Sequence, residues 1–159
     1  RRHTRFRNVT GVQTCALPIF NNNEKDLLWE LQKLLIRCEK LGFYLCGHNL
    51  KNFDIPMLAK RMIINGLKPY GLPKYDTKPW EIRAFDTKEF WQYGGYGSIA
   101  SLELMCVCLG VESSKTMEVT GNKVHDAFWN KKDIQGIVKY CEKDVSVLID
   151  VIHKIVSLK

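Results

Sequence analysis

The stretch Gly47-His-Asn-Leu-Lys-Asn-Phe-Asp-Ile-Pro56 decides the fold predicted for this chain of 159 residues. It follows the short apolar and aromatic run of residues 43–46, which is typical of a buried strand. Residues 53–65 predict a helix, because Pro56 is tolerated in a first helical turn. The stretch is therefore a strand, a turn and a helix. It places Asp54 just past the carboxyl end of a strand, where α/β sheets expose ligand sites.

The same kind of pattern extends along the chain in both directions. The expected elements are a helix capped by Asn23 and ending near Lys40, a loop over residues 67–78, a short strand from Ile82 to Asp86, a helix capped by Ser98 and running through Leu109, and a long helix from about Lys131 towards the C-terminus. Strands that alternate with helices predict an α/β domain.

Composition places the chain among ordinary globular proteins, with 45% hydrophobic and 26% charged residues. Its length is that of about one domain. No apolar run approaches the roughly 20 residues of a membrane span, so we expect a soluble protein with no membrane partner. The six cysteines form no CxxC pair and have no regular spacing. This pattern favours reduced, buried thiols in a cytoplasmic protein and argues against a zinc site.

The first 20 residues differ from the rest of the chain. They contain four arginines and no acidic residue, so they account for four of the seven net positive charges. The remaining charge gives only mild support for a nucleic-acid partner. The segment has three interpretations: a transit peptide, a basic tail, or an artefact, because Val9 to Ile19 closely resembles a translated sequencing adapter. We favour the artefact. We expect residues 1–20 to be non-native or disordered, and residues 21–159 to form the domain.

Two groups of residues carry the chemistry. Asp54 follows a strand end, although an isolated Asp in a first helical turn also simply complements the helix dipole. Tyr140 and Asp144 are spaced i, i+4 on one helix face, although an apolar seam with a solvated acid accounts for that spacing equally well. Metal-assisted cleavage of a phosphodiester needs carboxylates that hold cations about 3.5–4 Å apart, and a group that orients the attacking water. Asp144 fits the first task and Tyr140 the second.

The motifs together resemble a known family. Asn49-x-x-x-Phe53-Asp54 resembles the second exonuclease motif of the proofreading domains of B-family DNA polymerases, and Tyr140-x-x-x-Asp144 resembles the third. The spacing of about 90 residues between them also fits. Further matching runs are Phe85-Asp-Thr-Lys-Glu-Phe-Trp91, Ser101-Leu-Glu-Leu and Tyr140-Cys-Glu-Lys-Asp-Val145. From about Asn21 onward the chain thus resembles the stand-alone bacterial group of predicted 3′–5′ exonucleases related to the polymerase B exonuclease domain.

This resemblance is to the DEDD type, tyrosine subclass, because residue 139 is Lys where the other subclass has His. It implies an RNase H-like fold of the DnaQ superfamily, a mixed sheet flanked by helices, with two divalent cations, Mg²⁺ or Mn²⁺. It implies that Asp144 binds a metal directly, that Asp54 acts on the second metal, often through water, and that Tyr140 orients the nucleophilic water. Hard cations take oxygen ligands, which suits these carboxylates and not the cysteines.

The resemblance also implies a substrate and the residues that contact it. Asn49 and Phe53 are expected to contact the 3′-terminal nucleotides of single-stranded DNA, Asn49 by a hydrogen bond and Phe53 by packing against a base. Replication or repair proteins are conceivable partners, but the sequence names none.

The family's first motif, a strand that ends in Asp-x-Glu and supplies two of the four metal-binding carboxylates, has no counterpart in this chain. No acidic residue precedes Glu24, and Glu24 and Asp26 belong to the start of an amphipathic helix. Because the adapter-like segment stands where that strand is expected, truncation is the simplest explanation. Two acids out of four are too few to hold the metals, so we expect this chain to be inactive or nearly so.

Other features carry less weight. His125 and Asp126 are expected to be a surface or supporting pair, and the glycine-rich run Gly94-Gly-Tyr-Gly97 a plain loop. Asp86 is expected to support the site from behind. Phe85, Phe90 and Trp91 are expected in the core and not as platforms for bases.

Three functions therefore compete. The first is a nuclease domain that removes nucleotides from DNA 3′ ends in its intact form. The second is a degenerate exonuclease fold that holds single-stranded nucleic acid without cutting it. The third is a scaffold domain within a larger polymerase. An upstream strand ending in Asp-x-Glu would distinguish the first from the second.

Overall fold

The computed structural model describes Ile19 and residues 21–95, 100–113 and 121–157. Its elements are α1 (Glu24–Lys40), β1 (Leu45–Gly47), α2 (Asp54–Ile64), the 3-10 turn η1 (Pro79–Glu81), β2 (Ala84–Asp86), α3 (Thr87–Gln92), α4 (Leu102–Leu109), the 3-10 turn η3 (Gly121–Lys123), α5 (Val124–Trp129) and α6 (Ile134–Val156). Helices cover both sides of a small parallel sheet. The α/β fold class predicted from the sequence is therefore confirmed, and it is consistent with an RNase H-like architecture.

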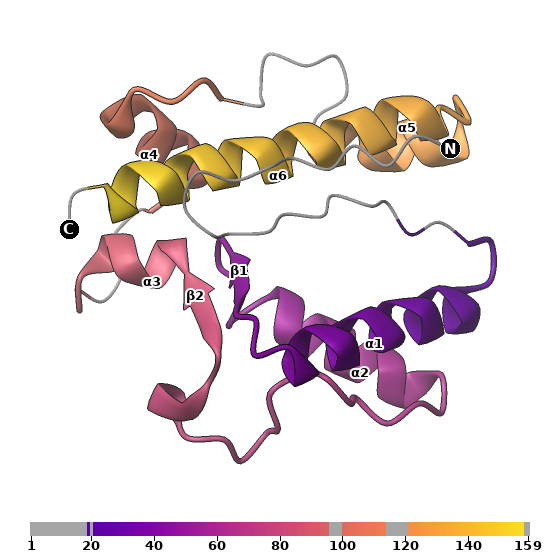
Figure 1. Cartoon of the computed structure of the whole chain (residues 1–159). Coiled ribbons are helices and arrows are strands. Elements are labelled where there is room, and N and C mark those ends of the chain that lie inside the picture. The colour runs from indigo at the N-terminus through magenta and orange to yellow at the C-terminus, as the bar shows by residue number, and fades with distance from the viewer. Residues whose placement is uncertain (1–18, 20, 96–99, 114–120, 158–159) are drawn as a thin grey trace.

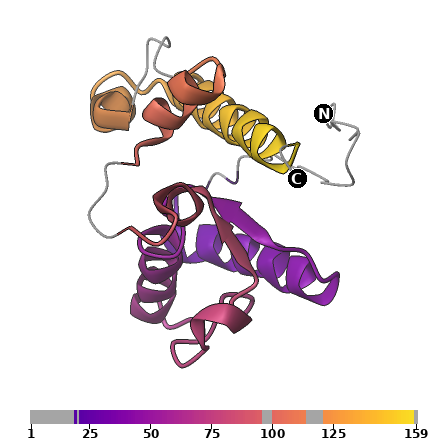
Figure 2. The same ribbon diagram turned by 90° about the vertical axis from the view of Figure 1, so that its left-hand side faces the viewer.

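The sheet described by the structure consists of β1 and β2, which pair in parallel with Leu45 opposite Ala84 and Gly47 opposite Asp86. Because successive residues of a strand point to opposite faces, the two faces of this sheet contact different helices. Leu45 packs against the core of α1 and α2, whereas Phe85 packs against the core of α4 and α6. Figure 1 shows these two groups of helices on opposite sides of the strands, and the turned view in Figure 2 shows the same separation.

Each group of helices has its own apolar core. On one side the buried residues are Leu28, Leu35, Met62 and Leu72, and on the other they are Met105, Cys106, Val147, Val151 and Ile155. The three α6 residues of the second core recur every four positions, so one stripe of this long helix is fully covered. Burying an aliphatic side chain of this size contributes about 1.5–3 kcal/mol. The two cores hold the strands, and therefore the ends of the strands, at fixed positions between the helices.

Helix ends show where sequence-based boundaries were right. The Asn23 side chain accepts hydrogen bonds from the backbone N–H groups of Lys25 and Asp26, which confirms it as the cap of α1. α2 spans one residue less at each end than the expected residues 53–65. The strands are shorter than expected, and β1 begins at Leu45 instead of Phe43.

Other boundaries were wrong. Ser98 was expected to cap the helix that ends at Leu109, but α4 begins at Leu102 and its cap is Ser101, whose hydroxyl accepts from the Leu104 N–H at 3.1 Å. Ser98 itself lies outside the described residues. The last helix begins at Ile134 and not near Lys131, because the Asp133 carboxylate caps it by accepting from the Gly136 N–H. The short helices α3 and α5 were not predicted at all, because six residues show too little periodicity.

The cysteines differ from expectation in their exposure. The thiols of the five described cysteines are free, but only Cys106 is buried, while Cys46, Cys108 and Cys141 are exposed. Apolar sequence neighbours do not ensure burial, and Cys46 is exposed although it lies in a strand of three residues. Among the described helices, none is long and apolar enough to cross a membrane.

Candidate functional site

Asp54 is the first residue of α2 and follows the loop that leaves the carboxyl end of β1. Its carboxyl group is partly buried, and this burial raises its pKa above the ordinary value of a carboxyl group. A hydrogen bond from its own backbone N–H lowers this pKa, and the negative charge of Asp86 raises it further. A carboxylate that is partly desolvated beside a second acid is poorly compensated by the protein alone, which is typical of a group that meets a ligand.

Asp86 ends β2 and lies directly behind this loop. Only 3% of it is exposed. Its Oδ1 accepts hydrogen bonds from the backbone N–H groups of Asn49 at 2.8 Å and Lys88 at 3.0 Å, and its Oδ2 accepts from the N–H of Lys51 at 3.0 Å. Three donors are what a buried carboxylate needs in place of water. Asp86 thus fixes the backbone on either side of Leu50, and the expectation that it supports the site from behind agrees with this position.

The loop between β1 and α2 is tightly folded. A Cβ at Gly47 would lie 2.7 Å from the Cβ of Leu50, so glycine is needed where the strand ends. Asn49 adopts a left-handed conformation with φ of 63°, which a non-glycine residue takes at some cost. His48 Nδ1 lies 3.0 Å from the hydroxyl of Thr87, and burial lowers the pKa of His48. A neutral imidazole at neutral pH follows from that shift.

Asn49 and Phe53, the predicted nucleic-acid contacts, are both placed near Asp54 by this loop. The Oδ1 of Asn49 accepts a hydrogen bond from the Lys88 ammonium at 3.3 Å. Phe53 occupies the cap position of α2, and 58% of it is exposed. An aromatic ring of such exposure beside a carboxylate is accessible for stacking with a base.

Tyr140 and Asp144 lie one turn apart on α6. The pKa of Tyr140 is raised to about 12, first because its phenol is partly buried and next because it hydrogen-bonds the Asp144 carboxylate. A hydrogen bond with the backbone of Gly121 lowers the pKa of Tyr140. Gly121 lies close to the phenol, since a Cβ at this position would be 3.3 Å from the phenol oxygen. The phenol is therefore a neutral hydrogen-bond donor at physiological pH, and it lies between Asp144 of its own helix and Gly121 of the η3 turn.

The structure brings the predicted residues together in two groups. Asn49, Phe53 and Asp54 share one loop, and Tyr140 and Asp144 share one helix face. Within the described ranges, no group of three or more His, Cys, Asp or Glu side chains lies close enough together to hold a metal ion. The donor set of the described residues therefore does not fit a two-metal centre.

The residue that sequence reasoning undervalued is Asp86. Its position in the run Phe85-Asp-Thr pointed only to a strand end, and its three backbone partners come from a loop 35 to 37 residues earlier and from the next turn. A signal was present nonetheless, because an Asp directly after an apolar strand pair is unusual inside a core.

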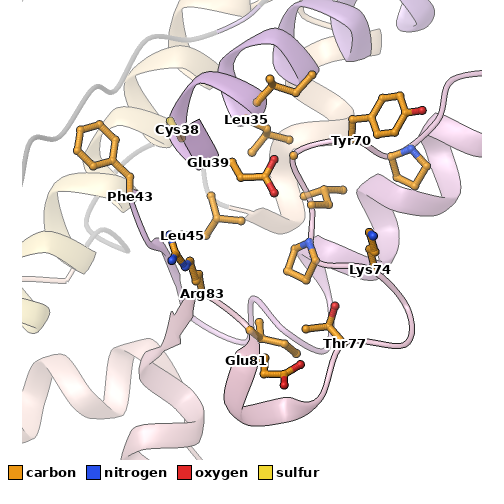
Figure 3. A pocket seen from close by; sticks show the side chains of 16 residues that line it. Leu35, Cys38, Glu39, Phe43, Leu45, Tyr70, Lys74, Thr77, Glu81 and Arg83 are labelled. Carbon is orange, nitrogen blue, oxygen red and sulfur yellow. The ribbon is translucent and has the colours of Figure 1, made fainter. Parts of the chain in front are cut away.

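A cavity of about 500 Å³ lies elsewhere, between the end of α1, the loop at residues 69–74 and the segment before β2 (Figure 3). Leu45 and Arg83, which line it, stand at the amino ends of the two strands. None of the predicted site residues lines this cavity. Because ligands of α/β sheets bind at the carboxyl ends of the strands, the loop of Asp54 and not this cavity is the candidate site.

The remaining features have structural roles. Asp126 accepts from the Asn130 side chain at 2.7 Å and pairs with Lys131 at 3.2 Å, while the His125 ring lies 6.5 Å from that of Trp129. His125 is exposed, as a surface pair requires. Phe85 and Trp91 pack against the core of α4 and α6, as expected, whereas Phe90 is 37% exposed. The run Gly94-Gly-Tyr-Gly97 lies partly outside the described residues.

Comparison with protein families gives one match. The family model of predicted 3′–5′ exonucleases related to the exonuclease domain of PolB matches residues 4–148, which is most of the chain. The chain belongs to this family. No curated protein matches the chain, and no solved structure does either.

Membership confirms the resemblance found in the motifs and makes the chain an exonuclease-related domain. The match runs through residues 9–19, so the foreign origin of that segment stays a prediction. The individual roles of Asn49, Phe53, Asp54, Tyr140 and Asp144 also stay predictions.

Proposed function

We propose that this chain is a 3′–5′ exonuclease-family domain that binds the 3′ end of single-stranded DNA, and that its 159 residues alone hydrolyse that DNA slowly or not at all. The observation that carries the proposal is the placement of Asp54 at the carboxyl end of β1, in one loop with Asn49 and the exposed ring of Phe53. This loop offers a carboxylate, an amide and a stacking surface to one ligand.

Each residue of the loop has a task that suits a DNA end. Phe53 stacks with the terminal base, which favours single strands because their bases are unpaired. Asn49 offers its amide N–H groups to an acceptor, since its oxygen is already bonded to Lys88. In the intact enzyme Tyr140 orients a water or a phosphate oxygen, and in this chain its single O–H is donated to the Asp144 carboxylate.

Complete members of this type use two divalent cations, Mg²⁺ or Mn²⁺, which activate water and stabilise the leaving oxygen. Asp54 and Asp144 are the two carboxylates that this chain contributes. The 159 residues contain no Asp-x-Glu sequence, and the described residues gather no third ligand next to either acid. Because hard cations need several oxygen ligands, the described residues of this chain support no metal-dependent step.

A nuclease assay tests the activity part of this proposal. The substrate is a 5′-labelled single-stranded oligonucleotide with Mn²⁺ or Mg²⁺, and the matched control is Asp144→Asn. We expect the two proteins to release 3′ nucleotides at the same, near-background rate. Robust degradation that Asp144→Asn abolishes would contradict the proposed inactivity.

A second candidate is a module that binds single-stranded nucleic acid as its only function. The same loop favours it, because the exposed Phe53 ring and the Lys88 ammonium bonded to Asn49 are present without a metal centre. Fluorescence anisotropy with single-stranded and duplex oligonucleotides tests it. Micromolar binding that prefers single strands supports it, and equal or undetectable binding of both contradicts it.

The five free thiols further favour a reducing, cytoplasmic location.

A further inference from the structure

Three hydrogen bonds join Asn49, Asp86 and Lys88 into a closed ring. The Oδ1 of Asp86 accepts from the backbone N–H of Asn49 at 2.8 Å and from that of Lys88 at 3.0 Å. The side chains of the same two residues meet each other, because the Lys88 ammonium lies 3.3 Å from Asn49 Oδ1. One carboxylate oxygen of Asp86 therefore holds the backbones of Asn49 and Lys88 in the positions at which their side chains form a hydrogen bond.

This ring is a rigid part of the structure. Asp86 is 3% exposed, and its second oxygen is bonded to the Lys51 N–H, so both oxygens have partners. Asn49 keeps a left-handed φ of 63°, which such a network can maintain. Lys88 is itself only partly exposed. Side chains held this firmly lose little entropy when a ligand binds.

The charge of Lys88 is the unusual feature of the ring. The neighbouring Lys51 is neutralised by Glu89, since its ammonium lies 2.5 Å from a Glu89 carboxylate oxygen. For Lys88, no carboxylate of the described residues lies within ion-pair distance, and its partner is the neutral amide of Asn49. Lys88 keeps two further N–H donors, and Asn49 keeps both hydrogens of its amide nitrogen. A cation and an amide that present several donors at one place suit an anion with several oxygens.

We propose that Lys88 and Asn49 form a phosphate-binding pair for the backbone of the bound nucleic acid, and that Asp86 is the positioning residue that holds the pair in place. This inference rests on the proposed function, because it names a contact to the strand that enters beside Asp54. The ligand group is a phosphodiester. Contacts of this kind set the position of a strand and are independent of its base sequence.

The first test is the salt dependence of DNA binding. Each phosphate contact to a single strand contributes about 0.7 to the slope of log affinity against log salt. We expect Lys88→Met to lower the slope by about that amount and to weaken binding about fivefold at low salt. Lys88→Arg keeps the charge and restores the slope. The matched control is Lys33→Met on α1, whose ammonium is bonded to Glu30 at 2.6 Å and which leaves the slope unchanged.

A chemical change in the DNA identifies the phosphate. Oligonucleotides that carry a neutral methylphosphonate at one of the last three linkages are measured against wild type and Lys88→Met. At the linkage that Lys88 contacts, the substitution weakens binding to wild type and has no further effect on Lys88→Met. If all linkages weaken both proteins equally, Lys88 does not bind a phosphate.

The positioning role of Asp86 is tested without DNA, by hydrogen exchange of backbone amides. In Asp86→Asn, an amide oxygen at the Oδ1 position still accepts from the Asn49 and Lys88 N–H groups. The amide nitrogen then takes the Oδ2 position and cannot accept from the Lys51 N–H. We expect the Lys51 amide to exchange about tenfold faster or more, and the Asn49 and Lys88 amides to change little. Asp133→Asn, a helix cap with one bond to the Gly136 N–H, is the control and leaves all three amides unchanged.

The outcomes separate this inference from the proposed function. If wild type does not bind single-stranded DNA, the proposed function fails, and the exchange experiment still decides whether Asp86 holds the loop. If wild type binds but Lys88→Met has the wild-type salt slope, the phosphate-binding pair is wrong and the proposed function stands. If Asp86→Asn changes the exchange of none of these three amides, Asp86 does not position the pair.

Discussion

The two acidic centres of this domain are built in opposite ways. Asp54 begins α2 directly after an irregular loop whose shape depends on a buried acid, Asp86, that lies more than thirty residues later in the chain. Asp144 belongs to a regular helix of 23 residues, and its partner Tyr140 is one turn away. The first centre is positioned by long-range hydrogen bonds and the second by local helix geometry. Changes behind the loop should therefore affect the first centre far more than comparable changes affect the second.

The largest difference is expected when the carboxylates that bond backbone N–H groups are removed. Asp86→Ala leaves three buried or partly buried N–H donors unpaired, which we expect to cost about 3 kcal/mol of unfolding free energy or more. Asp133→Ala removes one exposed cap of α6 and should cost about 1 kcal/mol. Urea unfolding of both variants measures the difference. Equal losses would mean that Asp86 is only a cap of α3.

Aromatic side chains give the next difference. Phe53→Ala should weaken binding of single-stranded DNA about tenfold, the amount expected for one stacked base. Trp129 on α5 is a matched control because it has the same exposure, 58%. Trp129→Ala should leave affinity unchanged, as its ring packs edge-on against Phe128 and under the Lys132 ammonium. Fluorescence anisotropy compares the two variants, and an equal effect of both contradicts the assignment of Phe53.

The second centre is probed through its phenol. The pKa of Tyr140, about 12 in the folded protein, exceeds its ordinary value of 10 because the phenol is partly buried and bonded to Asp144. The folded state thus holds this proton more tightly than the unfolded state does. Its stabilising effect is complete below pH 10 and is lost as the pH rises to about 12. Ultraviolet titration should show one late-titrating tyrosine that Asp144→Asn shifts towards 10, and an unshifted titration would contradict the hydrogen bond.

The smallest effect is expected from Asp54 itself. Because burial raises its pKa, the ionised carboxylate is less favourable in the folded protein than in the unfolded chain. The destabilisation is absent when the Asp54 carboxyl group is protonated. It appears as the pH rises through the ordinary pKa of 3.8, and it is complete above the raised pKa of the folded protein. Asp54→Asn should therefore raise the thermal unfolding temperature slightly at pH 7 and not at pH 3. A lower unfolding temperature at pH 7 would show that Asp54 stabilises the loop.

Sequence alone predicted what is local. The Asn23 cap, the bounds of α2 and the shared helix face of Tyr140 and Asp144 follow from rules that span a few residues. The motifs also identified the family, since several separated runs occur in the right order. Short elements escaped prediction because three to six residues carry too little periodicity to distinguish a strand or a helical turn from a loop.

Long-range contacts could not be predicted. Nothing near Asn49 in the sequence indicates that its backbone bonds to Asp86 or that its side chain meets Lys88. These contacts arise because β1 and β2 are parallel neighbours, so that both strands end at the same edge of the sheet. The sequence placed acids at both strand ends, but only the pairing of the strands shows that Asp86 supports the loop that precedes Asp54.

We propose that the chain has a DNA-binding loop without a complete metal centre. Electron paramagnetic resonance titration of Mn²⁺ tests it most directly, because free and bound ions give different signals. We predict no site tighter than about 1 mM, as expected for isolated carboxylates, and no change on Asp144→Asn. Two ions bound per chain at micromolar concentration, with one lost in Asp144→Asn, would contradict the account.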